Sequence, residues 1–119
     1  MSLLTDTQRA QLLANGRTNA PRNAAGQAGL DFVPIVKLFT PDAGATWLLT
    51  ELDPDDDDIA FGLCDLGLGC PEPGYVSLTE LATVRGKPGL PVERDCHFKA
   101  DKPLTAYARE AYAAGRSTA

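Results

Sequence analysis

The stretch FVPIVKLFTPDAGATWLLTELDPDDDDIAFGLCD, residues 32–65, decides the fold. Except for Lys37, its first nine residues are apolar, aromatic or β-branched, which is typical of a strand. The PDAG sequence at 41–44 predicts a turn, because proline fixes φ and glycine permits a positive φ. Residues 45–52 then predict the returning strand of a β-hairpin, and residues 59–65 a third strand beyond the acidic loop 53–58. Strands joined by turns this short pair antiparallel.

The N-terminal segment predicts a helix followed by a linker. Thr5 and Gln8 form a capping box for a helix from Asp6 to Asn15, and Gly16 is the expected stop. The apolar stripe of this helix is thin, so we expect loose packing, and residues 16–30 read as a flexible linker. The predicted organisation is therefore an N-terminal helix and linker at 1–30 and a single α+β domain at 31–119.

The second half of the chain predicts a short strand at 75–76, a helix capped by Ser77 and ended by Gly86, a strand at 92–98 and a last helix ended by Gly115. The complete order predicts an α+β fold with a mainly antiparallel sheet of four to five strands and helices packed on one face. Within the hairpin, Trp47 lies mid-strand between apolar neighbours, so we expect it to be buried.

The charge of the chain is unevenly distributed. The net charge is −5, yet residues 31–72 contain one lysine against ten acidic residues, whereas residues 85–119 contain seven basic and four acidic residues. The pI of about 4.7 argues against general affinity for nucleic acid. The chain shows no apolar run long enough to cross a membrane and begins without a secretory signal pattern, so we expect a cytoplasmic protein.

An acidic cluster interrupts the strand pattern. Glu51 and Asp53 precede four consecutive aspartates, Asp55, Asp56, Asp57 and Asp58. The spacing fails as a calcium loop, because Asp58 and Cys64 stand where glycine and glutamate are needed. We predict that Asp53 and Asp55–Asp58 bind a basic protein partner, since a turn alone needs fewer acids. The alternatives are a solvated hairpin connection and weak binding of a divalent cation.

The candidate catalytic residues are Glu93, Asp95 and His97. If residues 92–98 form a strand, the three side chains share one face and could perform acid–base chemistry. The alternative is that they are the solvent face of that strand. The three cysteines (Cys64, Cys70 and Cys96) lack the close paired spacing of zinc ligands, so we expect no metal and no cofactor.

Five short segments together resemble a known family: KLF at 37–39, ATWL at 45–48, DDIAFG at 57–62, GYVSL at 74–78 and ERD at 93–95. The sequence is similar over residues 31–114 to small bacterial proteins of unknown function found on plasmids, integrative elements and phages. The resemblance implies a mobile-element setting and an accessory, regulatory or anti-defence role, and it brings no activity, cofactor or catalytic residue.

The function expected first is therefore a non-enzymatic protein-binding module of a mobile genetic element. One alternative is a small metal-dependent or acid–base enzyme that uses His97 with Glu93 and Asp95. Another is a nucleic-acid accessory protein that uses the basic residues of the C-terminal part: Arg85, Lys87, Arg94, Lys99, Lys102, Arg109 and Arg116.

Overall fold

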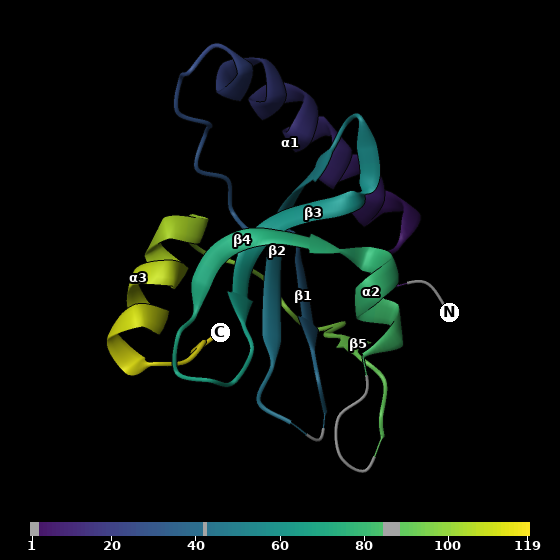
Figure 1. Cartoon of the computed structure of the whole chain (residues 1–119), viewed down its shortest axis with the longest axis vertical. Coiled ribbons are helices and arrows are strands. Elements are labelled where there is room, and N and C mark those ends of the chain that lie inside the picture. Colours follow the sequence, from purple (N-terminus) through teal and green to yellow (C-terminus); the bar gives the residue numbers. More distant parts are fainter. Residues whose placement is uncertain (1–2, 42, 85–88) are drawn as a thin grey trace.

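A five-stranded antiparallel sheet with three helices makes up the described residues, 3–41, 43–84 and 89–119, of the computed structural model (Figure 1). The strands are β1 Val36–Phe39, β2 Thr46–Asp53, β3 Asp56–Asp65, β4 Glu72–Ser77 and β5 Glu93–Arg94. Their order across the sheet is β4-β3-β2-β1-β5, and every neighbouring pair is antiparallel. The predicted α+β class and antiparallel sheet are confirmed.

The hairpin predicted from residues 32–52 is present. β1 pairs with β2 in a register that places Leu38 opposite Trp47. Asp42 of the predicted turn lies outside the described residues. The third strand begins at Asp56, earlier than predicted, and only Pro54 and Asp55 form the turn. The expectation of an acidic loop spanning 53–58 is therefore wrong, because cross-strand pairing extends into the acidic residues.

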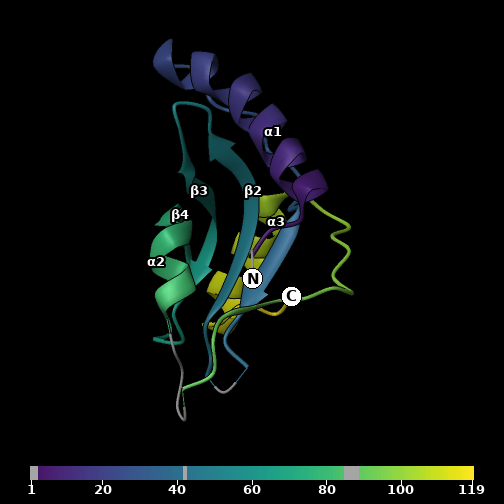
Figure 2. The ribbon, with the colours of Figure 1, turned by 90° about the vertical axis from the view of Figure 1, so that its right-hand side faces the viewer.

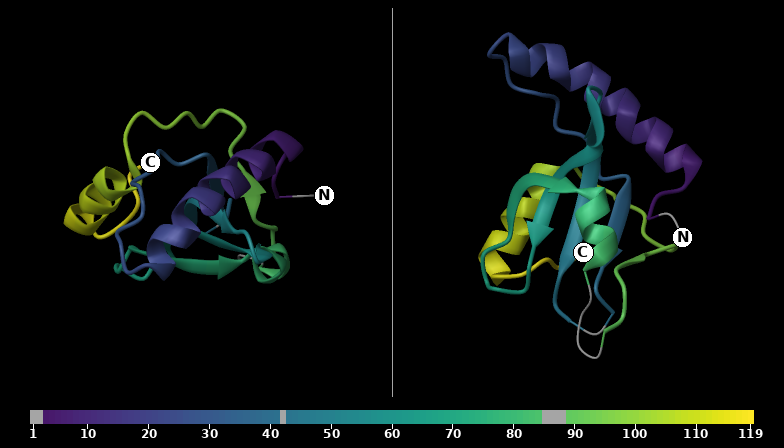
Figure 3. Two further views of the ribbon diagram at one scale, coloured as in Figure 1. Left: turned by 90° about the horizontal axis from the view of Figure 1, so that it is seen from above. Right: turned by 45° about the vertical axis from the view of Figure 1, so that its right-hand side comes forward.

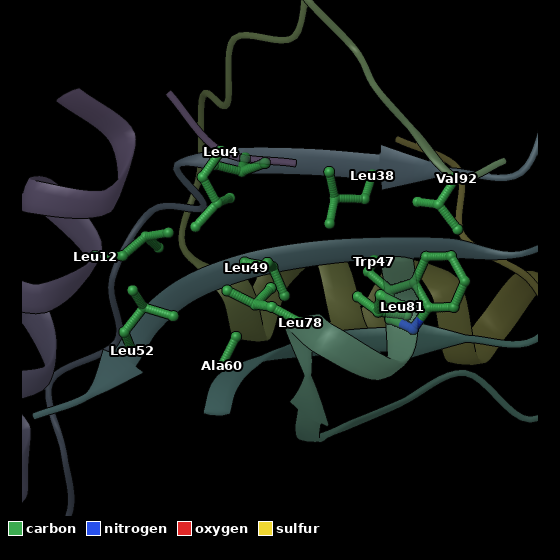
Figure 4. Close-up of a cluster of buried hydrophobic side chains, with 11 residues drawn as sticks. Leu4, Leu12, Leu38, Trp47, Leu49, Leu52, Ala60, Leu78, Leu81 and Val92 are labelled. Atoms are coloured by element: carbon green, nitrogen blue, oxygen red, sulfur yellow. The ribbon is translucent and has the colours of Figure 1, made fainter. Parts of the chain in front are cut away.

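Helices cover both faces of the sheet, whereas the sequence pattern predicted helices on one face only. Leu78 and Leu81 of α2 (Leu78–Thr83) share a core cluster with Trp47 and Leu49 (Figure 4). On the other face, α3 (Leu104–Ala114) packs with Leu48 and Leu63 through Leu104, Tyr107 and Ala111. Successive strand residues point to opposite faces, so Leu48 and Leu49 belong to different clusters. Trp47 is 3% exposed, which confirms its predicted burial.

Helix α1 spans Asp6–Ala24 and begins with the predicted Thr5 and Gln8 capping box. It does not end at Gly16, so the predicted end at Asn15 is wrong, and residues 16–24 of the predicted flexible linker are helical. A Cβ atom on Gly16 would lie 1.7 Å from the Leu52 carbonyl oxygen, so this glycine permits a close approach of helix to strand. Leu12 is fully buried in the main core cluster, contrary to the expected loose packing. Figures 2 and 3 show α1 crossing the end of the sheet beside the β2–β3 turn.

The remaining predicted boundaries are met in part. Ser77 caps α2 by accepting a hydrogen bond from the Glu80 amide. That helix ends at Thr83, and the predicted stop at Gly86 lies outside the described residues. Gly115 ends α3 in the left-handed conformation, at φ 72°. None of the helices in the described residues has the length and apolar character needed to span a membrane.

Candidate functional site

A β-bulge in β2 positions the central residue of the candidate site. The register of β2 against β3 shifts between Leu49 and Glu51, which leaves Thr50 without a partner residue. A bulged residue reverses the alternation of the strand beyond it. Consequently Leu49 and Leu52 belong to the same core cluster, although residues three positions apart in a regular strand point to opposite faces. Glu51 is turned to the opposite face.

Three cross-strand neighbours form a row on that face. Glu51 of β2 lies opposite Phe61 of β3, and Phe61 lies opposite Tyr75 of β4. Side chains at directly opposed positions of an antiparallel pair lie on the same face within contact distance. The rings of Phe61 and Tyr75 are 5.0 Å apart between centroids and tilted by 56°. Tyr75 is 67% exposed, so this row presents a carboxyl and an aromatic surface to solvent.

Two adjoining hollows open above this row. The larger, about 340 Å³, lies between α1, the segment 29–32, the sheet and the start of α3. The smaller, about 240 Å³, lies between α1 and the β2–β3 turn. Both hollows are lined by Asn23, Glu51, Phe61 and Tyr75. The two hollows therefore meet at these residues and form one groove. We call it the α1 groove.

Helix α1 supplies the amides of the groove. The Asn15 Nδ2 donates to the Thr50 carbonyl oxygen at 2.8 Å, which satisfies the carbonyl of the bulged residue. One turn later, the Asn19 Nδ2 donates to Glu51 Oε2 at 2.7 Å and to the Leu30 carbonyl at 3.2 Å. The Leu30 amide donates back to Asn19 Oδ1 at 2.7 Å. These bonds fix α1, the segment after it and Glu51 relative to one another.

The electrostatics of the groove are one-sided. Burial raises the pKa of Glu51 above its ordinary value, and the hydrogen bond from Asn19 opposes that rise. Asp31 also lines the larger hollow, but its carboxylate accepts from the Thr105 amide at 3.2 Å and from the Thr105 hydroxyl, at the start of α3. Neither hollow has a lysine, arginine or histidine among its described lining residues. Such a site suits a cation or a hydrogen-bond donor.

The acidic turn, Asp53–Asp58, forms one rim of the groove. Asp53 and Asp55 line the smaller hollow. The Asp53 Oδ1 accepts from the Asp55 amide at 2.9 Å, and the Asp56 Oδ1 accepts from the Asp58 amide at 3.2 Å, as in Asx turns. Asp57 forms an ion pair with Arg9 at 3.6 Å. Two of these aspartates therefore shape the backbone of the turn.

Asp58 has a structural role in α2. Its Oδ1 accepts from the Thr79 amide at 2.8 Å and from the Thr79 hydroxyl at 2.7 Å, and its Oδ2 accepts from the Ser77 hydroxyl at 2.5 Å. These bonds, those from Ser77 and Thr79 above all, lower the pKa of Asp58. The sequence grouped Asp58 with the partner-binding acids, whereas the structure attaches it to the first turn of a helix.

Glu93, Asp95 and His97 do not share a strand face. β5 ends at Arg94, so the expected strand at 92–98 is wrong, and Asp95 and His97 follow in a turn. The Asp95 carboxylate lies 3.7 Å from Lys37 Nζ, and its Oδ1 accepts from the His97 amide at 2.9 Å. None of the three side chains is hydrogen-bonded to another of them, and both Glu93 and His97 are exposed.

The cysteines are free thiols, and one of the C-terminal basic residues is paired with an acid. Cys64 is partly buried, and Cys70 and Cys96 are exposed as free thiols. Burial, with a smaller effect of Glu72, raises the pKa of Cys64. Over the described ranges no three His, Cys, Asp or Glu side chains converge as metal ligands would. Among the basic residues, Lys102 pairs with Glu110 at 2.7 Å, and Arg85 and Lys87 lie outside the described residues.

Sequence reasoning missed most of the groove. It counted Glu51 among the acidic residues, but it did not select Asn19, Asn23 or Tyr75. A usable signal was present, because Asn15, Asn19 and Asn23 recur at four-residue spacing and therefore share one face of a helix. The premature helix end predicted at Asn15 concealed that pattern.

The comparisons with known proteins give a family match without a function. A family model described as "Protein of unknown function (DUF2958)" matches residues 3–118. No curated protein and no solved structure matches the chain.

Proposed function

This chain belongs to the DUF2958 family of proteins of unknown function, so we propose a function from the residues exposed on its own surface. It is a non-enzymatic binding module that recognises a basic segment of another protein through the acidic turn. In the mobile-element setting that the sequence resemblance implies, such a module is an accessory, regulatory or anti-defence component. The proposed contact residues narrow to Asp55, Asp56 and Asp57, because Asp58 is bonded to α2.

The observation that carries the proposal is the exposure of these three carboxylates beside a groove without basic lining. Asp55, Asp56 and Asp57 are all exposed, and the Asp55 side chain has no hydrogen-bonding partner among the described residues. Asp57 has only a solvent-exposed ion pair with Arg9, which a competing cation can replace at little cost. Clustered charge of one sign steers an oppositely charged partner and raises its association rate.

The two alternative functions have weaker support. An enzyme centred on His97 needs a positioned partner for the imidazole, and Asp95 pairs with Lys37 instead. A nucleic-acid accessory protein needs free cations, yet Lys102 pairs with Glu110 and the Arg94 guanidinium donates to the Leu3 carbonyl at 3.2 Å. The described residues of neither alternative line the two hollows of the α1 groove, whereas the acidic turn borders the smaller one.

The test is a titration of isotope-labelled protein with a lysine-rich peptide at low and physiological salt, followed by NMR. The variant replaces Asp55, Asp56 and Asp57 by asparagine, which keeps the Asx-turn acceptor at position 56. We expect peptide binding to weaken roughly tenfold at low salt, equivalent to about 1.4 kcal/mol, and the difference to shrink as salt rises.

The matched control removes three exposed charges elsewhere, with Glu72, Glu80 and Glu93 replaced by glutamine. If the peptide binds both triple variants equally, general electrostatics explains the binding and the acidic turn is not a recognition element. The proposal would also be contradicted if the peptide changed the chemical shifts of wild-type residues over the whole surface instead of around the acidic turn.

A further inference from the structure

The α1 groove contains a carboxyl group that lacks a cationic partner. Glu51 is partly buried, its Oε2 accepts from Asn19, and no described lysine or arginine pairs with it. The other carboxylate of the larger hollow, Asp31, is occupied by Thr105 at both oxygens. Of the two carboxyl groups that line the larger hollow, Glu51 is therefore the one with an oxygen free to bind a ligand.

The bulge in β2 and two asparagines of α1 hold Glu51 in place. The bulge at Thr50 turns it away from the main core, and the Asn15 bond to the Thr50 carbonyl secures the bulge. Asn19 fixes one carboxylate oxygen at 2.7 Å. A carboxylate held in this way loses little side-chain entropy when a ligand binds, so the site is preorganised.

The aromatic neighbours narrow the chemistry of the ligand. Phe61 and Tyr75 follow Glu51 in the cross-strand row, and both line each of the two hollows. An exposed tyrosine ring that is supported by a second ring offers a flat surface beside a carboxylate. A guanidinium group matches this pair, because it binds a carboxylate with parallel hydrogen bonds and stacks on aromatic faces. A lysine ammonium lacks the planar shape and is more strongly hydrated.

We propose that the α1 groove is an arginine-binding subsite, in which Glu51 pairs with the guanidinium of a partner arginine and Tyr75 stacks on it. The inference rests on the proposed function, since the arginine belongs to the basic segment that the acidic turn attracts. The hollow of about 340 Å³ is open to solvent and accommodates one long side chain. Asp55 on the rim then faces the basic residues that flank this arginine.

The experiment compares three lysine-rich peptides that differ at one central position: arginine, citrulline or lysine. Citrulline keeps the shape of arginine and removes its charge. Each peptide is titrated against the wild-type chain, Glu51→Gln, Tyr75→Leu and the control Glu72→Gln, an exposed β4 glutamate outside both hollows. The readouts are the dissociation constant and the shifts of the Asn19 side-chain amide.

We expect the arginine peptide to bind the wild type at least tenfold more tightly than the citrulline peptide and several-fold more tightly than the lysine peptide. Glu51→Gln should abolish the preference over citrulline, Tyr75→Leu should reduce the preference over lysine, and Glu72→Gln should keep both. The effect is measured as a coupling between the central peptide residue and Glu51 or Tyr75. A general destabilisation of the chain would weaken all three peptides alike and would not produce this coupling.

Each remaining outcome overturns a defined statement. An arginine preference that survives in Glu51→Gln overturns the subsite. A second outcome is that the wild type binds all three peptides equally and that only the Asp55, Asp56 and Asp57 substitutions weaken this binding. That result overturns the subsite and leaves the proposed function standing. A wild-type chain that binds none of the peptides overturns both.

Discussion

Strand β2 passes through two different environments within six residues. Its first half, with Trp47, Leu48 and Leu49, is buried between α2 on one face and α3 on the other. After the bulge at Thr50, Glu51 faces a groove lined by amides, carboxylates and aromatic rings. The first half thus serves the stability of the fold, whereas the second half exposes polar chemistry on a rigid strand. The bulge allows one strand to do both.

The largest expected effect lies in the first half. Trp47→Ala removes a side chain that is 3% exposed, and the resulting cavity should cost about 3–5 kcal/mol of unfolding free energy. Trp47→Phe, the control, should cost less. Chemical denaturation measures the change. If Trp47→Ala is nearly neutral in stability but abolishes peptide binding, the two halves of β2 are not divided as described.

The second effect concerns the contact between α1 and the second half. Gly16→Ala would gain about 1 kcal/mol of helix propensity. The new Cβ would lie 1.7 Å from a backbone oxygen of Leu52, so steric repulsion should win. We expect a net loss of about 1–3 kcal/mol and faster hydrogen exchange in α1. Gly74→Ala is the matched control, because its Cβ would meet no atom within 4 Å. Equal losses in both variants would contradict the close approach.

Gly16 also shows where sequence reasoning succeeds and fails. The capping box at Thr5 and the left-handed Gly115 depend on residues a few positions apart, and both could be predicted. The role of Gly16 depends on a carbonyl 36 residues further along the chain. In sequence it resembles a helix stop, and only the packed structure distinguishes a stop from a close approach.

The third effect separates two acids of the same turn. Asp58→Ala removes the acceptor of the Ser77 hydroxyl and of the Thr79 amide and hydroxyl, so the first turn of α2 should loosen and Tm should fall. Asp55→Ala, the control, should leave Tm almost unchanged, since no described residue bonds to that side chain. Thermal unfolding by circular dichroism measures both. The distinction fails if the two variants unfold at the same temperature.

The acidic residues teach the same lesson about prediction. The sequence showed where the acidic residues cluster and what net charge they carry, yet it could not distinguish the acids that stabilise the fold from those exposed to a partner. Asp58 bonds to a helix 19 residues away, and Glu51 changes face because of a bulge that no local motif announces. The candidate site was therefore predictable as a charged region and not as a groove.

The smallest expected effect is on the pH dependence of stability, and it has opposite signs for Glu51 and Asp58. The raised pKa of Glu51 means that the folded state holds its proton more tightly than the unfolded chain, whose ordinary value is near 4.5. That stabilisation is complete below about pH 4.5 and is lost as pH rises through the raised folded value. Asp58 behaves in the reverse way, because its lowered pKa stabilises the fold above about pH 3.8 and this is lost as pH falls.

Glu51→Gln should therefore raise Tm slightly at neutral pH and change it less near pH 4. The ionised Glu51 carboxylate is partly desolvated and has Asp31, Asp53 and Asp55 around the same groove, so none of these neighbours compensates its charge. Thermal unfolding of the variant and of the Glu72→Gln control across pH 4 to 8 measures the difference. A Tm difference that stays constant with pH would mean that Glu51 is as well solvated in the groove as in the unfolded chain. A gain that grows with pH would mean that the groove gives up stability to keep an unpaired carboxylate, which a bound guanidinium would then restore.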